Sequence, residues 1–484
     1  MLLAALVAGC GSATKTSSGT GTTPDGAALV GANTLAFISV DSDFGSSQWQ
    51  QLDALSKKFP KRDELIGHLK QAMSDQGVDY DRDIKPALGP ELDVAFVSGG
   101  TDATTKAVAL TKPTDPAKFK ALVAKLRASD STADQHTVYR EVDGWYALSD
   151  SQAAIATVLK GGGDALADDD TFKEAMAKLP DDSLVKAYLD GRQLGSLVKK
   201  AAARANTGTG LDPSVLGLDS LTYIAASASA EDEGIRFSGA LNGGPATGGD
   251  FSSKIAQDVP ADAFAFLDTD GNSTADQLEK LKSNPQLGLG LAQLETVLGI
   301  SYDQVLDLLR GEIGFYARPA GGIPELTLAL RPDDVSGALA TLDKLVARLA
   351  LSAHATVRPG TQGGHPVKTI DLGEYKISYG SVADTILLTS GVSGIADFGG
   401  SGDRLPDSAD FKEAQDASGM PDETGGYFYL DLKDAIPMIE SFASLAGKDV
   451  PSDVNENLRP LRSFVSWSTR SGDTQTFDAF LEIK

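Results

Sequence analysis

The chain has 484 residues, 41% of them hydrophobic and 23% charged, which is a globular composition and excludes an intrinsically disordered chain. Asp and Glu number 67 against 43 Lys and Arg, a net charge of −24. A surface this acidic repels nucleic-acid phosphates and anionic lipid headgroups, so we expect no nucleic-acid partner. The single cysteine, Cys10, excludes an intramolecular disulfide.

The chain begins with an apolar run, Leu2 to Ala8, which ends in Val7-Ala8-Gly9-Cys10. This sequence resembles the lipobox of bacterial lipoproteins, in which the cysteine thiol takes a diacylglyceryl group and the chain is cut before it. The resemblance implies a signal at 1–10, lipidation of Cys10 and an exported protein anchored to the outer face of the cytoplasmic membrane or cell envelope. Acyl chains hold a protein on a bilayer at about 0.8 kcal/mol per buried methylene.

No Lys or Arg precedes the apolar run, although a signal peptide needs a positive start. We therefore expect the true start codon to lie upstream. Residues 11–30 are rich in Ser, Thr and Gly, which predicts a flexible tether outside the fold. No other apolar run reaches the roughly 18 residues of a membrane-spanning helix.

The first predicted unit covers 31–242. It opens with a strand at Leu35 to Val40 and continues through amphipathic helical sequence to strands at 92–97 and 107–110. Asp143-Gly144 between two strand patterns predicts a β-hairpin. Helices and a strand at 184–189 follow, and two long strands, 221–230 and 235–241, close the unit.

Residues 243–258 are predicted to be a Gly- and Pro-rich linker, and 259–484 a second unit that repeats the first. The strongest repeat is the phrase Gly77 to Phe96, which returns as Gly299 to Phe315, with Glu91 matching Glu312. Shorter repeats, Phe-Lys-Glu-Ala and Tyr-Leu-Asp, follow in the same order. An additional strand near Tyr375 to Tyr379 has no predicted counterpart in the first unit.

Strands outnumber helices and many are joined by hairpins. The predicted fold class is therefore α+β, with two tandem copies of one unit, each a mainly antiparallel sheet with helices packed on one face. The export signal, the tether, the duplicated unit that opens with a strand and then Asp, and Lys58-Phe59-Pro60 resemble a bacterial family. It is the domain-of-unknown-function family with serial number thirty-three fifty-two. The resemblance implies export and duplication, and it supplies no catalytic residues.

The best candidate for a metal site is a calcium loop in which oxygen ligands recur at EF-hand-like spacing: Asp268, Asp270, Asn272, Asp276 and Glu279. The required glycine is misplaced, because Gly271 comes two positions early and Ser273 stands in its place. The alternative is a strand end followed by a helix that Ser273 caps, with Asp276 completing a capping box. We expect that alternative, and hence no metal and no cofactor.

The preferred functional interpretation is a non-enzymatic, lipid-anchored exported protein that binds an unidentified partner, a protein or a lipid, or organises the cell envelope. The alternative is a carrier for an apolar ligand held between sheet and helices, since Ala225, Ser227 and Ser229 leave one strand face thinly filled. Close helix packing is the simpler explanation of that strand. A hydrolase of unrecognised type has only scattered acids and serines in its favour.

Overall fold

The computed structural model describes residues 23–75, 77–98, 105–129, 137–205, 217–244, 248–282, 295, 299–320, 323–373, 375–445, 447–448 and 450–484. It shows an α+β protein that divides into two compact units. The first unit runs to Gly244 and includes Glu456–Pro460 and Ile483–Lys484, and the second comprises Pro245–Asn455 and Leu461–Glu482. Each unit is described below by itself.

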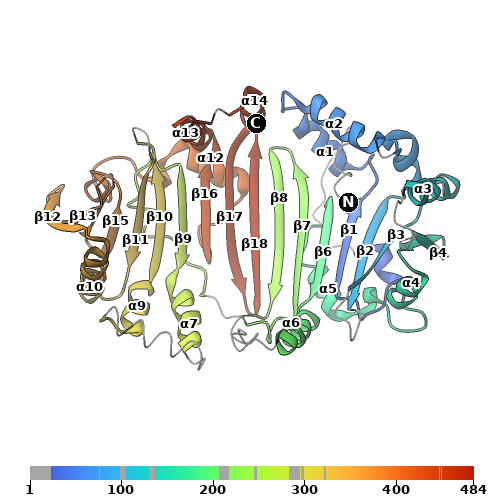
Figure 1. Ribbon diagram of the computed structural model, residues 1–484, viewed down its shortest axis with the longest axis horizontal. Helices are drawn as coiled ribbons and strands as arrows, with labels where there is room; N and C mark the ends of the chain where they lie inside the picture. The colour runs from blue at the N-terminus through green and yellow to red at the C-terminus, as the bar shows by residue number, and fades with distance from the viewer. Residues whose placement is uncertain are drawn as a thin grey trace. The chain divides into compact units, whose positions relative to one another are not determined.

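The sheet of the first unit is antiparallel throughout and has the order β4–β5–β3–β2–β1–β6–β7–β8 (Figure 1). Its strands are β1 Ala36–Asp41, β2 Glu91–Ser98, β3 Thr105–Thr111, β4 Val138–Val142, β5 Trp145–Ser149, β6 Val185–Asp190, β7 Tyr223–Glu231 and β8 Gly234–Asn242. The predicted hairpin is confirmed: Asp143 and Gly144 both adopt positive φ, 52° and 80°, between β4 and β5. Two positive φ angles are what a tight two-residue turn of this type requires.

Helices of the first unit lie on both faces of its sheet, so the prediction of one covered face is wrong. The helices are α1 Ser47–Ser56, α2 Arg62–Ser74, α3 Pro116–Ser129, α4 Gln152–Val158, α5 Asp170–Met176 and α6 Gly191–Ala205. On β5, Trp145 packs into a core with α4 and α5, whereas the adjacent Tyr146 packs on the other face against α3. Successive strand residues point to opposite faces, so consecutive buried residues require cover on both sides.

The sheet of the second unit has the order β12–β13–β14–β15–β11–β10–β9–β16–β17, also antiparallel. Hydrogen bonds Ser463–Glu482 and Thr469–Thr476 link β17 to β18. The strands are β9 Ala265–Asp270, β10 Glu312–Arg318, β11 Glu325–Arg331, β12 Thr356–Gln362, β13 His365–Asp371, β14 Lys376–Val382, β15 Thr385–Thr389, β16 Gly426–Asp431, β17 Leu461–Ser471 and β18 Thr474–Ile483.

The strand connections of the two units correspond one to one, from β1 with β9 to β8 with β18, except for one inserted hairpin. The pairings β3–β5 and β4–β5 recur as β11–β15 and β14–β15. This is the pattern expected for two copies of one unit. The additional strand was misplaced in the prediction, because β14, which contains Tyr379, corresponds to β4. The inserted strands are β12 and β13.

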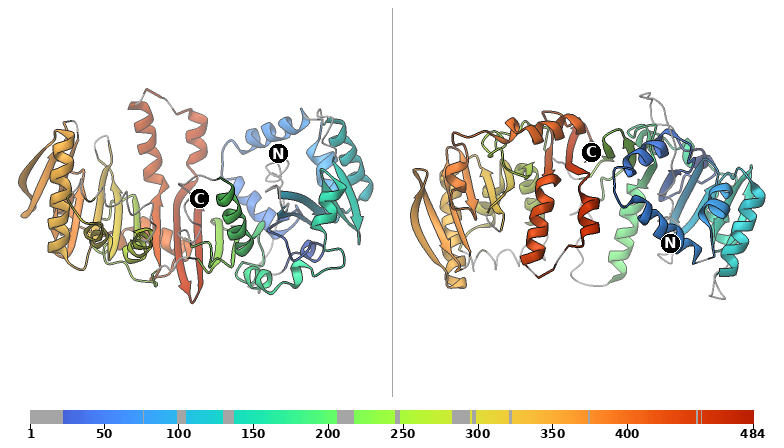
Figure 2. Two further views of the ribbon diagram at one scale, coloured as in Figure 1. Left: turned by 60° about the horizontal axis from the view of Figure 1, so that its bottom comes forward. Right: turned by 90° about the horizontal axis from the view of Figure 1, so that it is seen from above.

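Helices also cover both faces of the second sheet. They are α7 Gly271–Lys282, α9 Tyr302–Leu309, α10 Val335–Ala353, α11 Gly394–Asp397, α12 Ala409–Ser418, α13 Leu432–Leu445 and α14 Ser452–Leu458. On one face, Phe398 and Phe411 pack over β9 and β16. On the opposite face α10 packs on β11 and α13 on β16, and both helices project from the same side of this sheet (Figure 2).

The segment that precedes the first strand of each unit is part of the core, which corrects two predicted boundaries. Within the predicted tether, 11–30, Asp25–Ala28 form a 3-10 helix, and Ala27 and Val30 are fully buried. Within the predicted linker, 243–258, Ile255 and Ala256 are buried in the same way. A few apolar residues are enough to attach these segments to the core, because each packs against core side chains that other segments supply. We call residues 24–30 and 253–259 the lead-in turns.

Candidate functional site

A glutamate on β2 fastens the first lead-in turn to the sheet. The Glu91 carboxylate accepts hydrogen bonds from the backbone N–H groups of Asp25, at 3.2 Å, and Gly26, at 2.9 Å. Two residues along the same strand and on the same face is Asp93, which is 0% exposed. A Cβ atom on Gly26 would lie 1.8 Å from Asp93 Oδ2, so the backbone of the turn rests directly on this carboxyl group.

The second unit builds the same arrangement with Glu312 on β10. Its Oε1 accepts from Ser253 Oγ at 3.0 Å and from the backbone N–H groups of Lys254, at 2.8 Å, and Ile255, at 2.7 Å. Beside it, Asp268 is 0% exposed. In both units the lead-in turn is therefore held by one glutamate that lies next to a fully buried aspartate.

Strand register shows that the two buried aspartates belong to the same cross-strand pair of the unit but lie on opposite strands of that pair. In the first unit Asp93 of β2 lies opposite Ser39 of β1. In the second unit Asp268 of β9, the counterpart of β1, lies opposite Gly314 of β10. The flanking pairs match as well, since Asp41 faces Glu91 and Asp270 faces Glu312. The predicted match of Glu91 with Glu312 agrees with this register.

Burial disfavours the charged form of both aspartates. Burial raises the pKa of Asp93 well above its usual value, and the negative charge of Glu91 raises it further. Burial and the charge of Glu312 raise the pKa of Asp268 to about 8. Ser39 beside Asp93, and Ser253 and the Thr269 backbone N–H beside Asp268, act in the opposite direction and lower these pKa values. None of the described residues makes a hydrogen bond of good geometry to the carboxyl oxygens of either aspartate.

The surroundings of the two carboxyl groups differ on one side. In the first unit, Lys186 of β6 lies beyond Ser39 in the register, is buried, and has a pKa lowered by its desolvation. In the second unit Tyr427 of β16 takes that position next to Asp268. Burial raises the pKa of this Tyr427 hydroxyl well above its usual value, and the Asp268 charge adds to the effect.

The residues of the predicted calcium loop do not converge on a common point. Asp268 points into the core, whereas Asp270 accepts from the Asn272 backbone N–H and from Ser273 Oγ at the start of α7. Asp270 is therefore the capping residue that was assigned to Ser273. Asp276 and Glu279 bind Arg310 at 3.0 and 3.1 Å, so Asp276 completes no capping box. Among the described residues, no group of three or more His, Cys, Asp or Glu side chains could hold a metal ion.

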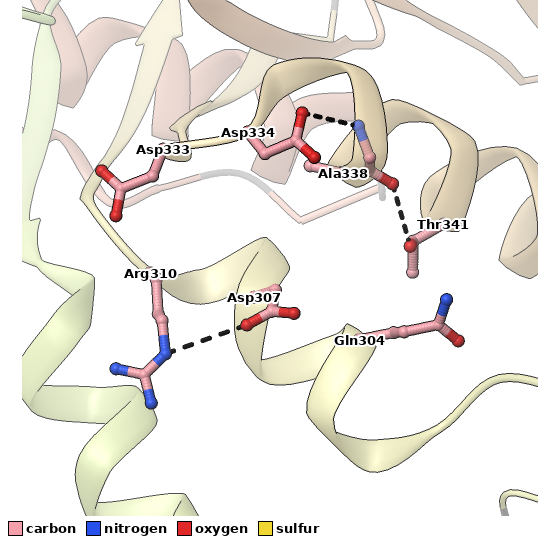
Figure 3. Close-up of a pocket in the computed structure, with 8 residues that line it drawn as sticks. Gln304, Asp307, Arg310, Asp333, Asp334, Ala338 and Thr341 are labelled. Carbon is pink, nitrogen blue, oxygen red and sulfur yellow. Dashed lines mark hydrogen bonds and ion pairs between the residues drawn. The ribbon is translucent and has the colours of Figure 1, made fainter.

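A cavity of about 350 Å³ lies between α9 and the start of α10 (Figure 3). Arg310 lines it and is held by Asp276, Glu279 and, at 3.9 Å, Asp307. Across the cavity, hydrogen bonds from Gly337 N–H and Ser336 lower the pKa of Asp334, which therefore carries its charge while capping α10. Carboxylates outnumber the one guanidinium among the lining residues, so the cavity favours positively charged groups over anions.

A smaller cavity of about 170 Å³ lies beside β16, lined by Asp410, Glu413, Tyr429, Asp431, Lys433, Arg462, Ser463 and Glu482. Burial and the nearby Asp434 charge raise the pKa of Asp431 to about 6. Ser463 pairs with Asp431 where Tyr223 pairs with Asp190 in the first unit. The Tyr223 side chain is fully buried and donates to Glu174, the counterpart of Glu413. Tyr223 of the first unit thus occupies the position that the smaller Ser463 takes beside the cavity in the second unit.

Comparison with known families decides the relationship that the sequence suggested. The model of the family described as protein of unknown function (DUF3352) matches residues 1–158 and again residues 148–483. The chain belongs to this family. Two separate matches of one family model also suggest a duplication.

The other comparisons add little about the DUF3352 chain. None of the curated proteins compared with it matches. Crystal form III of TP0453 covers 46% of this chain and 81% of its own, at 11% identity and a TM-score of 0.20. Crystal form I of TP0453 covers 47% and 80%, at 11% identity and a TM-score of 0.18. These scores are too low to carry an argument about fold or function.

The remaining predicted sites of the DUF3352 chain have different outcomes. Cys10 lies outside the described residues, so its lipidation stays a prediction. Ala225, Ser227 and Ser229 are buried, and α1 and α5 pack against their strand, which is the simpler explanation considered above. No described helix is long and apolar enough to span a membrane.

Sequence reasoning missed the two buried aspartates. Their signal is an acidic residue inside an apolar strand, as in Leu92-Asp93-Val94-Ala95 and in Phe266-Leu267-Asp268. An isolated acid in such a pattern is either a strand residue facing solvent or a buried group, and only the tertiary contacts distinguish them.

Proposed function

We propose that this protein is a lipid-anchored exported protein with a non-enzymatic binding role at the cell envelope. The observation that carries the proposal is Val7-Ala8-Gly9-Cys10 at the end of an apolar run, followed by Ser, Thr and Gly. Two or more acyl chains on Cys10 would hold the acidic body at a membrane whose anionic headgroups do not attract it.

The binding role is supported by the charge of the second unit's cavities. Both are lined by more carboxylates than cations, and the chain carries a net charge of −24. In the larger cavity Asp307, Asp333 and Asp334 face a single lining cation, Arg310, which also pairs with Asp276 and Glu279. This excess of carboxylates supports recognition of a cationic group of a partner.

The test of the anchor is metabolic labelling with palmitate in a bacterium that processes lipoproteins. Full-length protein with its natural upstream sequence should incorporate label and partition with membranes. Cys10→Ala should incorporate none while keeping the fold of the body, judged by circular dichroism. Unlabelled wild-type protein, or equal labelling of the variant, would overturn the proposal.

A second candidate, a carrier of an apolar ligand, is favoured by a partly exposed apolar row on the second sheet. In register order the row is Leu328 of β11, Phe315 of β10, Leu267 of β9 and Phe428 of β16. Phe315 is 38% and Leu267 42% exposed, on the face from which α10 and α13 project. Exposed apolar patches commonly mark binding surfaces.

Mass spectrometry of organic extracts from the purified chain separates the two candidates. Stoichiometric lipid in the wild type, lost in Phe315→Asp and kept in Phe237→Asp, would support the carrier. Phe237 is a suitable control because it is similarly exposed, at 47%, on β8 of the first unit. Extracts without bound lipid would eliminate the carrier.

A further inference from the structure

The two ends of each lead-in turn are attached differently. At the start of the turn a single glutamate side chain, Glu91 or Glu312, accepts the backbone N–H groups. At the end, backbone hydrogen bonds hold the turn, from Lys160 and Leu166 to Leu29 and Val30 in the first unit and from Gly399 and Leu405 to Asp258 and Val259 in the second. Weakening the glutamate contact therefore loosens the start of the turn.

The neighbouring aspartate is placed where its charge would weaken that contact. Asp93 lies beneath Gly26 and beside Glu91, and both of its carboxyl oxygens lack a hydrogen-bond partner in the described chain. The same holds for Asp268 beside Glu312. A second negative charge in a site of low polarity costs several kcal/mol if no partner neutralises it. Ionisation would therefore favour the state in which the turn has left and water has entered.

The presence of a buried aspartate in both units argues that this acid has a function. A buried unpaired carboxyl is destabilising compared with an apolar residue of similar size. Yet the same cross-strand pair contains an aspartate in both units. It lies on β2 in the first unit and on β9, the counterpart of β1, in the second. The residue opposite is small in each case, Ser39 or Gly314, which leaves room for the carboxyl.

We propose that each buried aspartate is a proton-operated latch: it holds the lead-in turn closed while protonated and releases it on ionisation. The groups that face Asp93 are Glu91, Asp25 and, from β6, Lys186 beyond Ser39. Those that face Asp268 are Glu312, Ser253 and Tyr427, with no cation among them. Lys186 therefore offsets part of the new charge at the first latch, and no such cation among the described residues does so at the second.

The first latch has a consequence for anchoring, which rests on the proposed function. Its turn directly follows the segment that would carry the acyl chains on Cys10. Release of residues 24–28, which precede the backbone hydrogen bonds of Leu29 and Val30, would lengthen the connection between membrane and body by up to five residues, or roughly 17 Å when extended. The protein would stand closer to the membrane at neutral pH than in alkaline surroundings.

Hydrogen exchange with mass spectrometry on the full chain in detergent tests the latch. Protection of 24–30 and of 253–259, corrected for the intrinsic pH dependence of exchange, is measured from pH 6 to 10. Both turns should lose protection with rising pH, by at least tenfold. Asp93→Asn should keep 24–30 protected throughout without affecting 253–259, and Asp268→Asn should do the reverse, so each variant is the control for the other.

Equal protection of both turns of the wild type at pH 6 and pH 10 would overturn the latch without any variant. So would variants whose turns open with the same pH dependence as the wild type. If Asp93→Asn does not fold, the wild-type profile and Asp268→Asn still decide. Exchange does not depend on acylation, so failure of palmitate labelling would refute the anchor and leave this result standing.

Discussion

Replacing Asp268 by Asn should change how the stability of the second unit depends on pH. Asp268 is fully buried beside Glu312, with a pKa of about 8 in the folded chain against about 3.9 in an unfolded one. Between these values the folded state binds one more proton than the unfolded state at this position. The stabilisation is fully present below about pH 4 and is lost as pH rises through about 8.

The magnitude follows from proton linkage. One proton contributes about 1.4 kcal/mol per pH unit to the slope of the unfolding free energy, which falls with rising pH in this window. Asn cannot ionise, so this part of the slope disappears. Relative to the wild type, Asp268→Asn should gain stability steadily from pH 4 to pH 8, by roughly 5 kcal/mol at most if the whole shift is realised.

Urea unfolding followed by the fluorescence of Trp467 measures this effect. Trp467 lies in the core of the second unit, and Trp49 and Trp145 of the first unit are replaced by Phe so that they do not contribute. Asp270→Asn is the matched control: it removes the same charge two residues along the strand, where Asn caps a helix about as well as Asp. Parallel pH profiles for Asp268→Asn and the wild type would refute the assignment of a neutral buried acid.

Two further predictions concern the second unit and use the same assay. Gly271→Ala should cost about 1–3 kcal/mol, because the new Cβ would lie 1.8 Å from the Leu309 carbonyl oxygen, whereas Gly249→Ala, with nothing within 4 Å, should be neutral; equal effects would contradict the close approach. Arg318→Met should lower the unfolding free energy by about 2 kcal/mol, a value between those of exposed and of buried ion pairs. Arg318 pairs with the nearly buried Glu325 and with the more exposed Asp262 and Asp397. Adding Glu325→Gln should recover part of that loss, and no recovery would show that the pair is not coupled.

Local sequence signals predicted the elements whose structure is set by their own residues. Asp143-Gly144 specifies a tight turn through its positive φ angles, whatever surrounds it. The repeat of Glu91 in Glu312 located corresponding strands because each glutamate begins its strand, β2 or β10. Such features are determined by chain geometry within a few residues.

Features that depend on tertiary contacts were missed. The first lead-in turn was predicted to be a tether and the second a linker from their composition. Ala27 and Ile255 are core residues only because strands far along the chain provide the side chains against which they pack. The hairpin of β12 and β13 could not be recognised as the insertion. The sequence pattern does not show which hairpin of the second unit lacks a counterpart in the first. A calcium loop was conceivable from spacing alone, and the direction of Asp268 into the core removed it.

The exchange of strands between the two buried aspartates constrains what the acid does. If a carboxyl were needed to bind a neighbour on one particular strand, it could not move from β2 to the counterpart of β1 and keep its role. What stays the same is the cross-strand pair, next to the pair that contains the glutamate, and a small residue opposite the acid. The requirement is therefore for a second acid beside that glutamate, from whichever strand provides it. An electrostatic effect of one carboxyl group on the other meets this requirement, because two neighbouring buried carboxyl groups cannot readily both be ionised.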